Sequence, residues 1–192
     1  GKSLPYVEFG DSDGARVGDW VIAIGNPFGL GNTVTAGILS ARGRDINAGP
    51  YDDFLQTDAP INRGNSGGPM FDMNGKVIGV NTLIYSPSGG SVGIGFATPA
   101  AIVSPVIAQL REFGQTRRGW LGVRIQSVSP EIAENHNLAA ASGAFVAAVV
   151  EDSPASAAGL KQGDIILRFN GHEVPHRRAL PRIVADTLVG SS

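Results

Sequence analysis

The stretch of sequence with the clearest chemical potential is residues 57–80, TDAPINRGNSGGPMFDMNGKVIGV, with Ser66 near its centre. Ser66 follows Gly64 and Asn65 and precedes two further glycines. A serine in a glycine-rich turn can present its hydroxyl outward while nearby backbone amides converge on one point, as acyl transfer requires. The sequence therefore indicates Ser66 as a candidate nucleophile. A plain turn between two strands is the alternative, because Gly, Asn and Ser are ordinary turn residues.

The same turn predicts an oxyanion hole. The amides of Gly64 and Ser66, with Asn65 between them, would converge on the carbonyl oxygen of a substrate. Each such donor contributes about 3 kcal/mol to stabilising the transition state of acyl transfer.

A general base for this serine is missing from the sequence around it. A serine hydroxyl is a weak nucleophile and needs a base, usually a histidine oriented by a carboxylate. All three histidines (136, 172 and 176) lie well after the serine, where we expect them to be structural or solvated. Asp52, Asp53 and Asp58 have no base to orient, so we do not assign them a catalytic role.

The run TDAPINRGNSGG resembles the active-site segment of the HtrA/Deg family of chymotrypsin-fold serine proteases, whose pattern TDAxINxGNSGG it matches almost residue for residue. Residues 19–30, DWVIAIGNPFGL, and 93–99, GIGFATP, are similar to the strands that flank that segment in the family. From residue 118 onward the chain is similar to the start of a PDZ domain. The resemblance implies a mostly β fold, the C-terminal half of a trypsin-like double β-barrel followed by a truncated PDZ domain.

What the resemblance implies for activity is an ATP-independent serine endopeptidase that acts on misfolded envelope proteins. In that family the catalytic His and Asp come from an upstream barrel, so we expect these residues to be a fragment that is inactive alone. The digestive branch of the fold has Asp where this chain has Asn65, which implies ordering by loop movement rather than by propeptide cleavage. The parent protein would be periplasmic, part of the stress response and a homotrimer or a multiple of one. A peptide-binding or chaperone-like module that does not cleave is the alternative.

The resemblance also assigns a primary specificity pocket. Its predicted lining is Ile61, Thr82, Leu83 and Ile84, which favours a small or medium aliphatic residue before the scissile bond. An Arg or Lys there would lack a carboxylate partner. The alternative is that Ile61 and Ile84 belong to the barrel core.

Two further sites follow from the same resemblance. Residues 42–53 would form a sensor loop that reports PDZ occupancy to the active site, with Arg44 as its switch arginine, although the spacing is about one residue short. Trp120, Leu121, Gly122 and Val123 would form the PDZ loop that binds a peptide carboxylate. The partners implied are unfolded proteins or peptide C-termini, captured by strand pairing.

Composition limits the other classes of function. The 192 residues carry a net charge of -2 with no basic block, which gives no support for nucleic-acid binding. No apolar run approaches the length of about 18 residues typical of a membrane helix. The sequence has no cysteine, and its three histidines show no metal-ligand spacing, so we expect neither disulfide, metal nor organic cofactor.

A chain of 192 residues could form one large domain or two small ones, and we expect two. We expect about six short strands and a closing helix over residues 1–114, a polar linker QTRRG at residues 115–119, and the PDZ domain over residues 120–192. Within the first region, Asn74-Gly75 predicts a β-hairpin turn. Residues 99–113 have helical spacing, with Pro105 marking a kink or, if Ser104 is the cap, the start of the helix.

Overall fold

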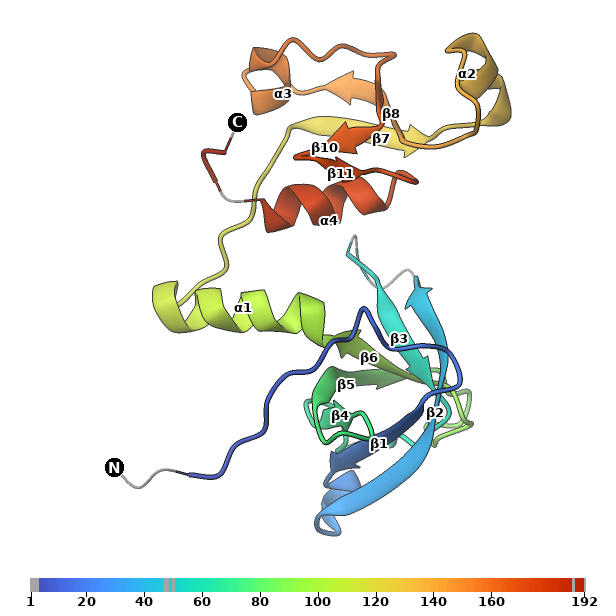
Figure 1. Cartoon of the computed structure of the whole chain (residues 1–192), viewed down its shortest axis with the longest axis vertical. Coiled ribbons are helices and arrows are strands. Elements are labelled where there is room, and N and C mark those ends of the chain that lie inside the picture. Colours follow the sequence, from blue (N-terminus) through green and yellow to red (C-terminus); the bar gives the residue numbers. More distant parts are fainter. Residues whose placement is uncertain (1–3, 47–48, 50, 188, 192) are drawn as a thin grey trace. The chain divides into compact units, whose positions relative to one another are not determined.

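The computed structural model describes residues 4–46, 49, 51–187 and 189–191. The contacts between residues divide the chain into two compact units, Gly1–Gly114 and Gln115–Ser192. Figure 1 shows that the first unit is built mainly from strands and that the second combines short strands with short helices. Each unit is described by itself.

The first unit is a closed barrel of six strands in the order β1-β2-β3-β6-β5-β4, with every neighbouring pair antiparallel (Figure 1). This confirms the mostly β prediction for the fold. A single-turn helix, η1, joins the first two strands. The elements are β1 (Trp20–Gly25), η1 (Pro27–Gly29), β2 (Thr33–Arg44), β3 (Phe54–Thr57), β4 (Pro69–Phe71), β5 (Val77–Ile84) and β6 (Gly95–Pro99).

The barrel interior is filled by small and medium apolar side chains. In β1, Val21 and Ala23 are fully buried whereas Trp20 is 60% exposed, as the two-residue period of a strand requires. The buried cluster comprises Ala15, Val21, Leu39, Leu55, Ala59, Met70, Ile78 and Ala97. The segment that carries Ser66 leaves β3 and re-enters the barrel at β4, so both of its ends are fixed by this sheet.

The helix that follows the barrel, α1 (Ala100–Phe113), is continuous across Pro105, where a kink or a helix start was predicted. Pro105 lies inside it, so the prediction that a helix starts at Pro105 is wrong. The side chain of Ser12 accepts a hydrogen bond from the amide of Ala101 at 3.0 Å and thereby satisfies an orphan donor at the true start. Gly114 ends the helix in a left-handed conformation, with its amide bonded to the carbonyl of Leu110.

The second unit contains a three-stranded sheet in the order β7-β8-β9 and a two-stranded ribbon, β10-β11. β7 therefore pairs on one side only, with β8. Residues 120–122, which precede β7, form a loop. The elements are β7 (Val123–Ser127), α2 (Pro130–Asn135), β8 (Ala144–Val149), α3 (Pro154–Ala157), β9 (Ile165–Ile166), β10 (Arg168–Phe169), β11 (His172–Glu173) and α4 (Ala179–Asp186).

The second unit has its own apolar core beneath the sheet. α4 contributes Leu180 and Val184 to it, and both side chains are buried. Ser129 and Ser153 cap the two short helices α2 and α3 through their side chains. The longest helix described has 14 residues, and none of the described helices has the length and apolar character to cross a bilayer.

We expect the barrel core to dominate the stability of the first unit. Leu39→Ala should lower the free energy of unfolding by about 2–5 kcal/mol, because it opens a cavity at a fully buried position. Val34→Ala, at a side chain that is 63% exposed on the same strand, is the matched control and should change it by less than about 0.5 kcal/mol. Urea unfolding followed through NMR signals of the barrel strands measures both, and equal losses would contradict this account of the core.

Candidate active site

Ser66 lies on the exposed side of the turn between β3 and β4, and its neighbour Asn65 is only 1% exposed. The turn is closed by two main-chain hydrogen bonds, from the amide of Asn65 to the carbonyl of Asn62 at 3.0 Å and from the amide of Gly68 to the carbonyl of Asn65 at 2.9 Å. Ser66 is thus exposed to solvent on a turn that main-chain hydrogen bonds hold in place, as a nucleophile requires.

The peptide groups on either side of Gly64 are held by the loop that follows β1. The amide of Phe28 donates to the carbonyl of Arg63 at 2.9 Å, and the amide of Asn26 donates to the carbonyl of Gly64 at 3.2 Å. In a trans peptide the N–H points away from the carbonyl of the same unit. The Gly64 amide therefore points away from the loop that holds Arg63.

The amides left for a substrate oxygen are those of Gly64 and Ser66. In the described part of the chain, hydrogen bonds of the turn use the amides of Asn65, Gly67 and Gly68, and none uses the amide of Gly64 or Ser66. The Asn65 amide is already bonded to Asn62, so within the predicted oxyanion hole Asn65 acts as a spacer.

Two glycines let the end of β1 approach the turn at backbone distance. A Cβ on Gly64 would lie 2.2 Å from the carbonyl oxygen of Asn26, and φ of Gly64 is +104°. A Cβ on Gly25 would lie 2.7 Å from the Cα of Asn65. Side chains at either position would push the β1 loop away from the turn and break the bonds that orient it.

Phe28 helps to hold the turn in a way that the sequence did not reveal. It adopts a left-handed conformation (φ 56°, ψ 14°), which is uncommon for an aromatic residue and marks stored strain. Its contribution to the turn is its main-chain amide, and residue type says little about where an amide points.

The predicted specificity-pocket residues lie close together. Ile61 is 1% exposed and packs on Gly95, where an added Cβ would meet its Cγ1 at 2.8 Å. Gly95 is in turn the β6 partner of Ile84 on β5. Thr82 is exposed and Leu83 is half-buried on the same strand. The pocket assignment stays a prediction, as does its alternative, since a side chain as buried as Ile61 also serves the core.

Asp58 has a structural partner near the turn. Its carboxylate accepts a hydrogen bond from the amide of Ile38 at 2.7 Å and so joins β2 to the end of β3. The first histidine in the sequence, His136, lies in the second unit. Its ring nitrogens lie 2.8 Å and 3.0 Å from the carbonyls of Ile132 and Gly163, which is a structural role.

Arg44 is the last residue of β2 rather than part of a loop. Its Nε donates to the side chain of Gln56 on the neighbouring strand at 2.8 Å. The predicted sensor loop thus starts two or three residues later than expected, and its residues 47, 48 and 50 lie outside the described part of the chain. The switch role of Arg44 stays a prediction.

The predicted carboxylate-binding loop of the second unit has its carbonyls turned inward. The carbonyl of Leu121 accepts from the amide of Ala155 at 2.9 Å, and that of Gly122 accepts from Val150 at 2.8 Å. By the geometry of trans peptides, the amides of Gly122 and Val123 point the opposite way. Trp120, at the entrance of the loop, is 62% exposed.

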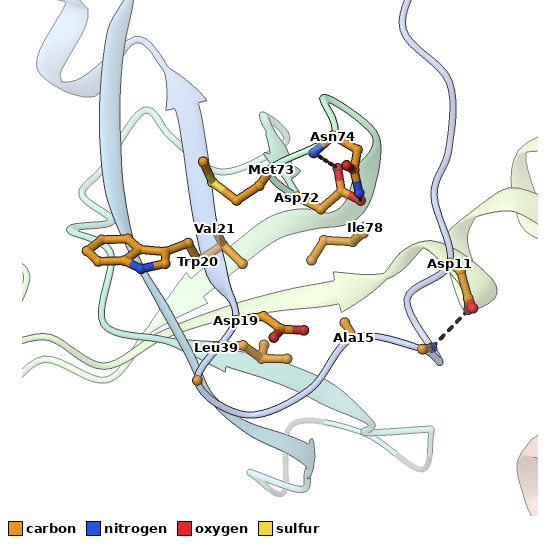
Figure 2. Close-up of a pocket in the computed structure, with 12 residues that line it drawn as sticks. Asp11, Ala15, Asp19, Trp20, Val21, Leu39, Asp72, Met73, Asn74 and Ile78 are labelled. Carbon is orange, nitrogen blue, oxygen red and sulfur yellow. Dashed lines mark hydrogen bonds between the residues drawn. The ribbon is translucent and has the colours of Figure 1, made fainter.

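A cavity of about 520 Å³ lies elsewhere on the barrel, between the start of β1 and the β4–β5 hairpin (Figure 2). None of the predicted site residues lines it. Asp11, Asp19 and Asp72 border it, and each accepts main-chain hydrogen bonds within its own turn. The bond from the Arg16 amide holds the pKa of Asp19 below its usual value. These carboxylates therefore serve loop structure, and no trio of acidic or histidine side chains in the described residues could hold a metal ion.

Comparison with known proteins identifies both units. Residues 1–80 match the trypsin-like peptidase domain and residues 109–183 match the PDZ domain. The second match starts inside α1, which packs on β5 and β6 of the barrel. The contacts therefore give the better physical boundary, after Gly114.

Known proteins are similar in sequence to this chain along nearly its whole length. A "Probable periplasmic serine endoprotease DegP-like" of Brucella suis biovar 1 (strain 1330) is 58% identical over 98% of this chain and 37% of its own length. Among solved structures, "HtrA-type protease AlgW with decapeptide" has a TM-score of 0.82 and 49% identity, covering 99% of this chain and 59% of that one. "HtrA-type protease AlgW with tripeptide" has a TM-score of 0.86 and 49% identity, covering 97% and 62%. The chain thus spans a little over a third of the curated relative.

We expect Gly64→Ala to distort the turn far more than Gly67→Ala. Both glycines have positive φ, so each alanine costs about 1–2 kcal/mol of backbone strain. Only the Cβ at position 64 also meets backbone atoms, whereas the one at position 67 meets nothing within 4 Å. Amide chemical shifts of Asn26 and Phe28 should move in Gly64→Ala and stay in place in Gly67→Ala. Equal shifts in the two variants would refute the close approach.

Proposed function

The chain belongs to the HtrA/DegP-type family of serine endoproteases, and on that premise we propose that it forms the nucleophile-bearing barrel and the adjoining PDZ domain of a longer endopeptidase. The observation that supports this most is the exposed Ser66 beside two amides, of Gly64 and Ser66, that the turn itself does not use. The longer polypeptide is the protein whose activity is proposed below.

In the proposed reaction the Ser66 oxygen attacks the carbonyl carbon of a peptide bond. The serine proton passes to a base, and the carbonyl oxygen becomes an oxyanion that accepts hydrogen bonds from the amides of Gly64 and Ser66. The base then protonates the leaving amine, which departs and leaves an acyl-enzyme. Water hydrolyses the ester by the same steps in reverse, and Ser66 regains its proton.

We propose that the base and its orienting carboxylate lie outside these 192 residues. No histidine precedes His136 in the sequence, and the ring of His136 is engaged by two carbonyls in the second unit. The 192 residues alone should therefore bind substrate near Ser66 without cleaving it at an appreciable rate.

The specificity we propose is for an aliphatic residue before the scissile bond. Ile61, Leu83 and Ile84 are apolar and at least half-buried, and Ile61 packs directly on Gly95 of β6. A charged side chain entering this environment would lose hydration without gaining an opposite charge. Unfolded proteins, which expose aliphatic segments, are the substrate class this suggests.

We propose that the second unit captures the C-terminal end of a peptide. Within the described residues β7 pairs along one edge only, and at its start the amides of Gly122 and Val123 point away from the groups that bind the preceding carbonyls. A peptide can add to such an edge as a further strand while its carboxylate accepts the loop amides. The two AlgW structures named above are of the protease with a decapeptide and with a tripeptide.

The remaining parts of the proposal follow from the family. The domain boundaries would be residues 1–114, 115–119 and 120–192, and the parent would act in the periplasm, where the DegP-like relatives are placed by name. A homotrimer, or a multiple of one, is the assembly we propose. Arg44 would couple the loop after β2 to peptide binding.

The second candidate function, a peptide-binding module without hydrolysis, has one observation in its favour. The two donors proposed for the peptide carboxylate, the amides of Gly122 and Val123, are main-chain groups that need no histidine. Such a protein would still bind C-terminal peptides and would leave Ser66 unreactive.

We expect a fluorophosphonate probe to label Ser66 in the longer polypeptide and not in the 192-residue chain. The phosphonate reports an activated serine, and activation requires the base. Ser66→Ala in the longer polypeptide is the control and should abolish labelling, as read by mass spectrometry. An unlabelled longer polypeptide would favour the peptide-binding module, and rapid labelling of the short chain would contradict the missing base.

We expect the second unit to distinguish a free peptide carboxylate from a blocked one. A fluorescent decapeptide ending in Leu-Val should bind the 192-residue chain at least about tenfold more tightly than the same peptide with an amidated end, because the loop amides would lose a charged acceptor. Fluorescence anisotropy measures both affinities, with Trp120 emission as a second readout. Equal affinities would rule out the carboxylate-binding loop.

A further inference from the structure

Asn81, in the middle of β5, binds three consecutive residues that follow Ser66. Its carbonyl accepts a hydrogen bond from the amide of Gly67 at 2.7 Å, and its amide donates to the carbonyl of Gly68 at 2.9 Å. Its side-chain Nδ2 donates to the carbonyl of Pro69 at 3.3 Å. One residue thus holds the whole segment by which the turn returns to the barrel.

The side chain of Asn81 is buried without being fully satisfied. Asn81 is 1% exposed, and its Oδ1 is one of two buried side-chain oxygens in the described residues that lack a hydrogen-bond partner. A buried acceptor without a donor lowers stability, so an apolar side chain of the same shape would suit the barrel better. The residue type therefore needs a reason other than the stability of the core.

The other such oxygen belongs to Asn65, on the opposite side of the serine. Its Nδ2 donates to the carbonyl of Pro60 at 3.4 Å, just as that of Asn81 donates to Pro69. Two buried carboxamides therefore hold the chain before and after Ser66, each by a donor to a proline carbonyl. The shared arrangement points to positioning of the turn rather than to packing.

We propose that Asn81 is a positioning residue for catalysis at Ser66, acting through residues 67–69 to fix the serine relative to its oxyanion amides. It contacts neither substrate nor the reacting atoms. The two backbone bonds would form with any residue at this place in β5, but the bond to Pro69 requires a side-chain donor of this length. That bond fixes the direction in which the segment leaves Ser66.

The proposal rests on the proposed endopeptidase function and is tested in the same longer polypeptide. Asn81→Leu keeps the approximate shape while removing both the donor and the unpartnered acceptor. It should leave the urea midpoint unchanged or raise it. We expect kcat and the rate of fluorophosphonate labelling to fall by about tenfold to a hundredfold, as small misplacements of a nucleophile do, with KM changed by less than about twofold.

Asn81→Asp and Asn74→Asp form a matched pair. The first places a carboxylate oxygen against the carbonyl of Pro69 and should lose activity to a similar degree. The second makes the same chemical change at an exposed hairpin residue and should keep the wild-type rate. The positioning role would be overturned if the Asn81 variants lost activity only in proportion to a loss of stability. It would also be overturned if KM changed while kcat did not.

Failure of the positioning role is distinguishable from failure of the proposed function. If the wild-type longer polypeptide is labelled and Asn81→Leu is labelled equally fast, only the positioning role is wrong. If the wild type is not labelled, the endopeptidase proposal fails. Hydrogen exchange in the 192-residue chain then tests whether Asn81 positions the turn. Exchange at the Gly67 amide should quicken by about tenfold in Asn81→Leu relative to the amide of Ala97, as local opening becomes easier; unchanged exchange would overturn the role.

Discussion

The contact on which the candidate active site depends is the backbone-to-backbone approach between the end of β1 and the turn that carries Ser66. Gly25 and Gly64 make it possible, because a Cβ on either would overlap the opposite chain. Only at that distance can the amides of Asn26 and Phe28 reach the carbonyls of Gly64 and Arg63. The direction of the Gly64 amide follows from the bond to the Arg63 carbonyl, so the proposed oxyanion hole depends on two loops and not on one.

The parts of this arrangement that depend on local residue type could be predicted from the sequence. The run from Gly64 to Pro69 predicted a tight turn with an outward serine, and the family resemblance predicted the strands that flank it. The structure describes that turn as exposed at Ser66 and closed at Asn65. The six-stranded barrel and the second unit are likewise as the sequence and its resemblance indicated.

The parts that sequence could not predict depend on partners distant in the chain. Ser12 caps a helix 89 residues later in the chain, near Ala101. For that reason the helix start predicted at Pro105 was wrong. Phe28 contributes its main-chain amide from a strained conformation that could not be predicted from its residue type. The end of β2 was misjudged because Phe54, on the next strand, pairs with Arg44 and extends the ladder that far. Each of these depends on tertiary context, which outweighs local preference.

Both units present their candidate binding groups by the same physical device. Carbonyls of the loop are bonded to the protein, by Phe28 in the barrel and by Val150 and Ala155 in the second unit, so that the amide following each points the opposite way. Main-chain donors placed in this way recognise a carbonyl oxygen or a carboxylate whatever the adjoining side chains are. This suits a protein whose proposed substrates share a backbone and little else.

The open edge of β7 also exposes the second unit to unwanted pairing. Until a ligand covers that edge, its row of donors and acceptors is offered to any extended polypeptide, including a strand from another molecule of the same kind. The five-residue length of β7 keeps such a mispaired ladder short, and Arg124 and Gln126 on its exposed positions add polarity. The same unpaired edge of β7 therefore allows peptide binding and creates a risk of aggregation.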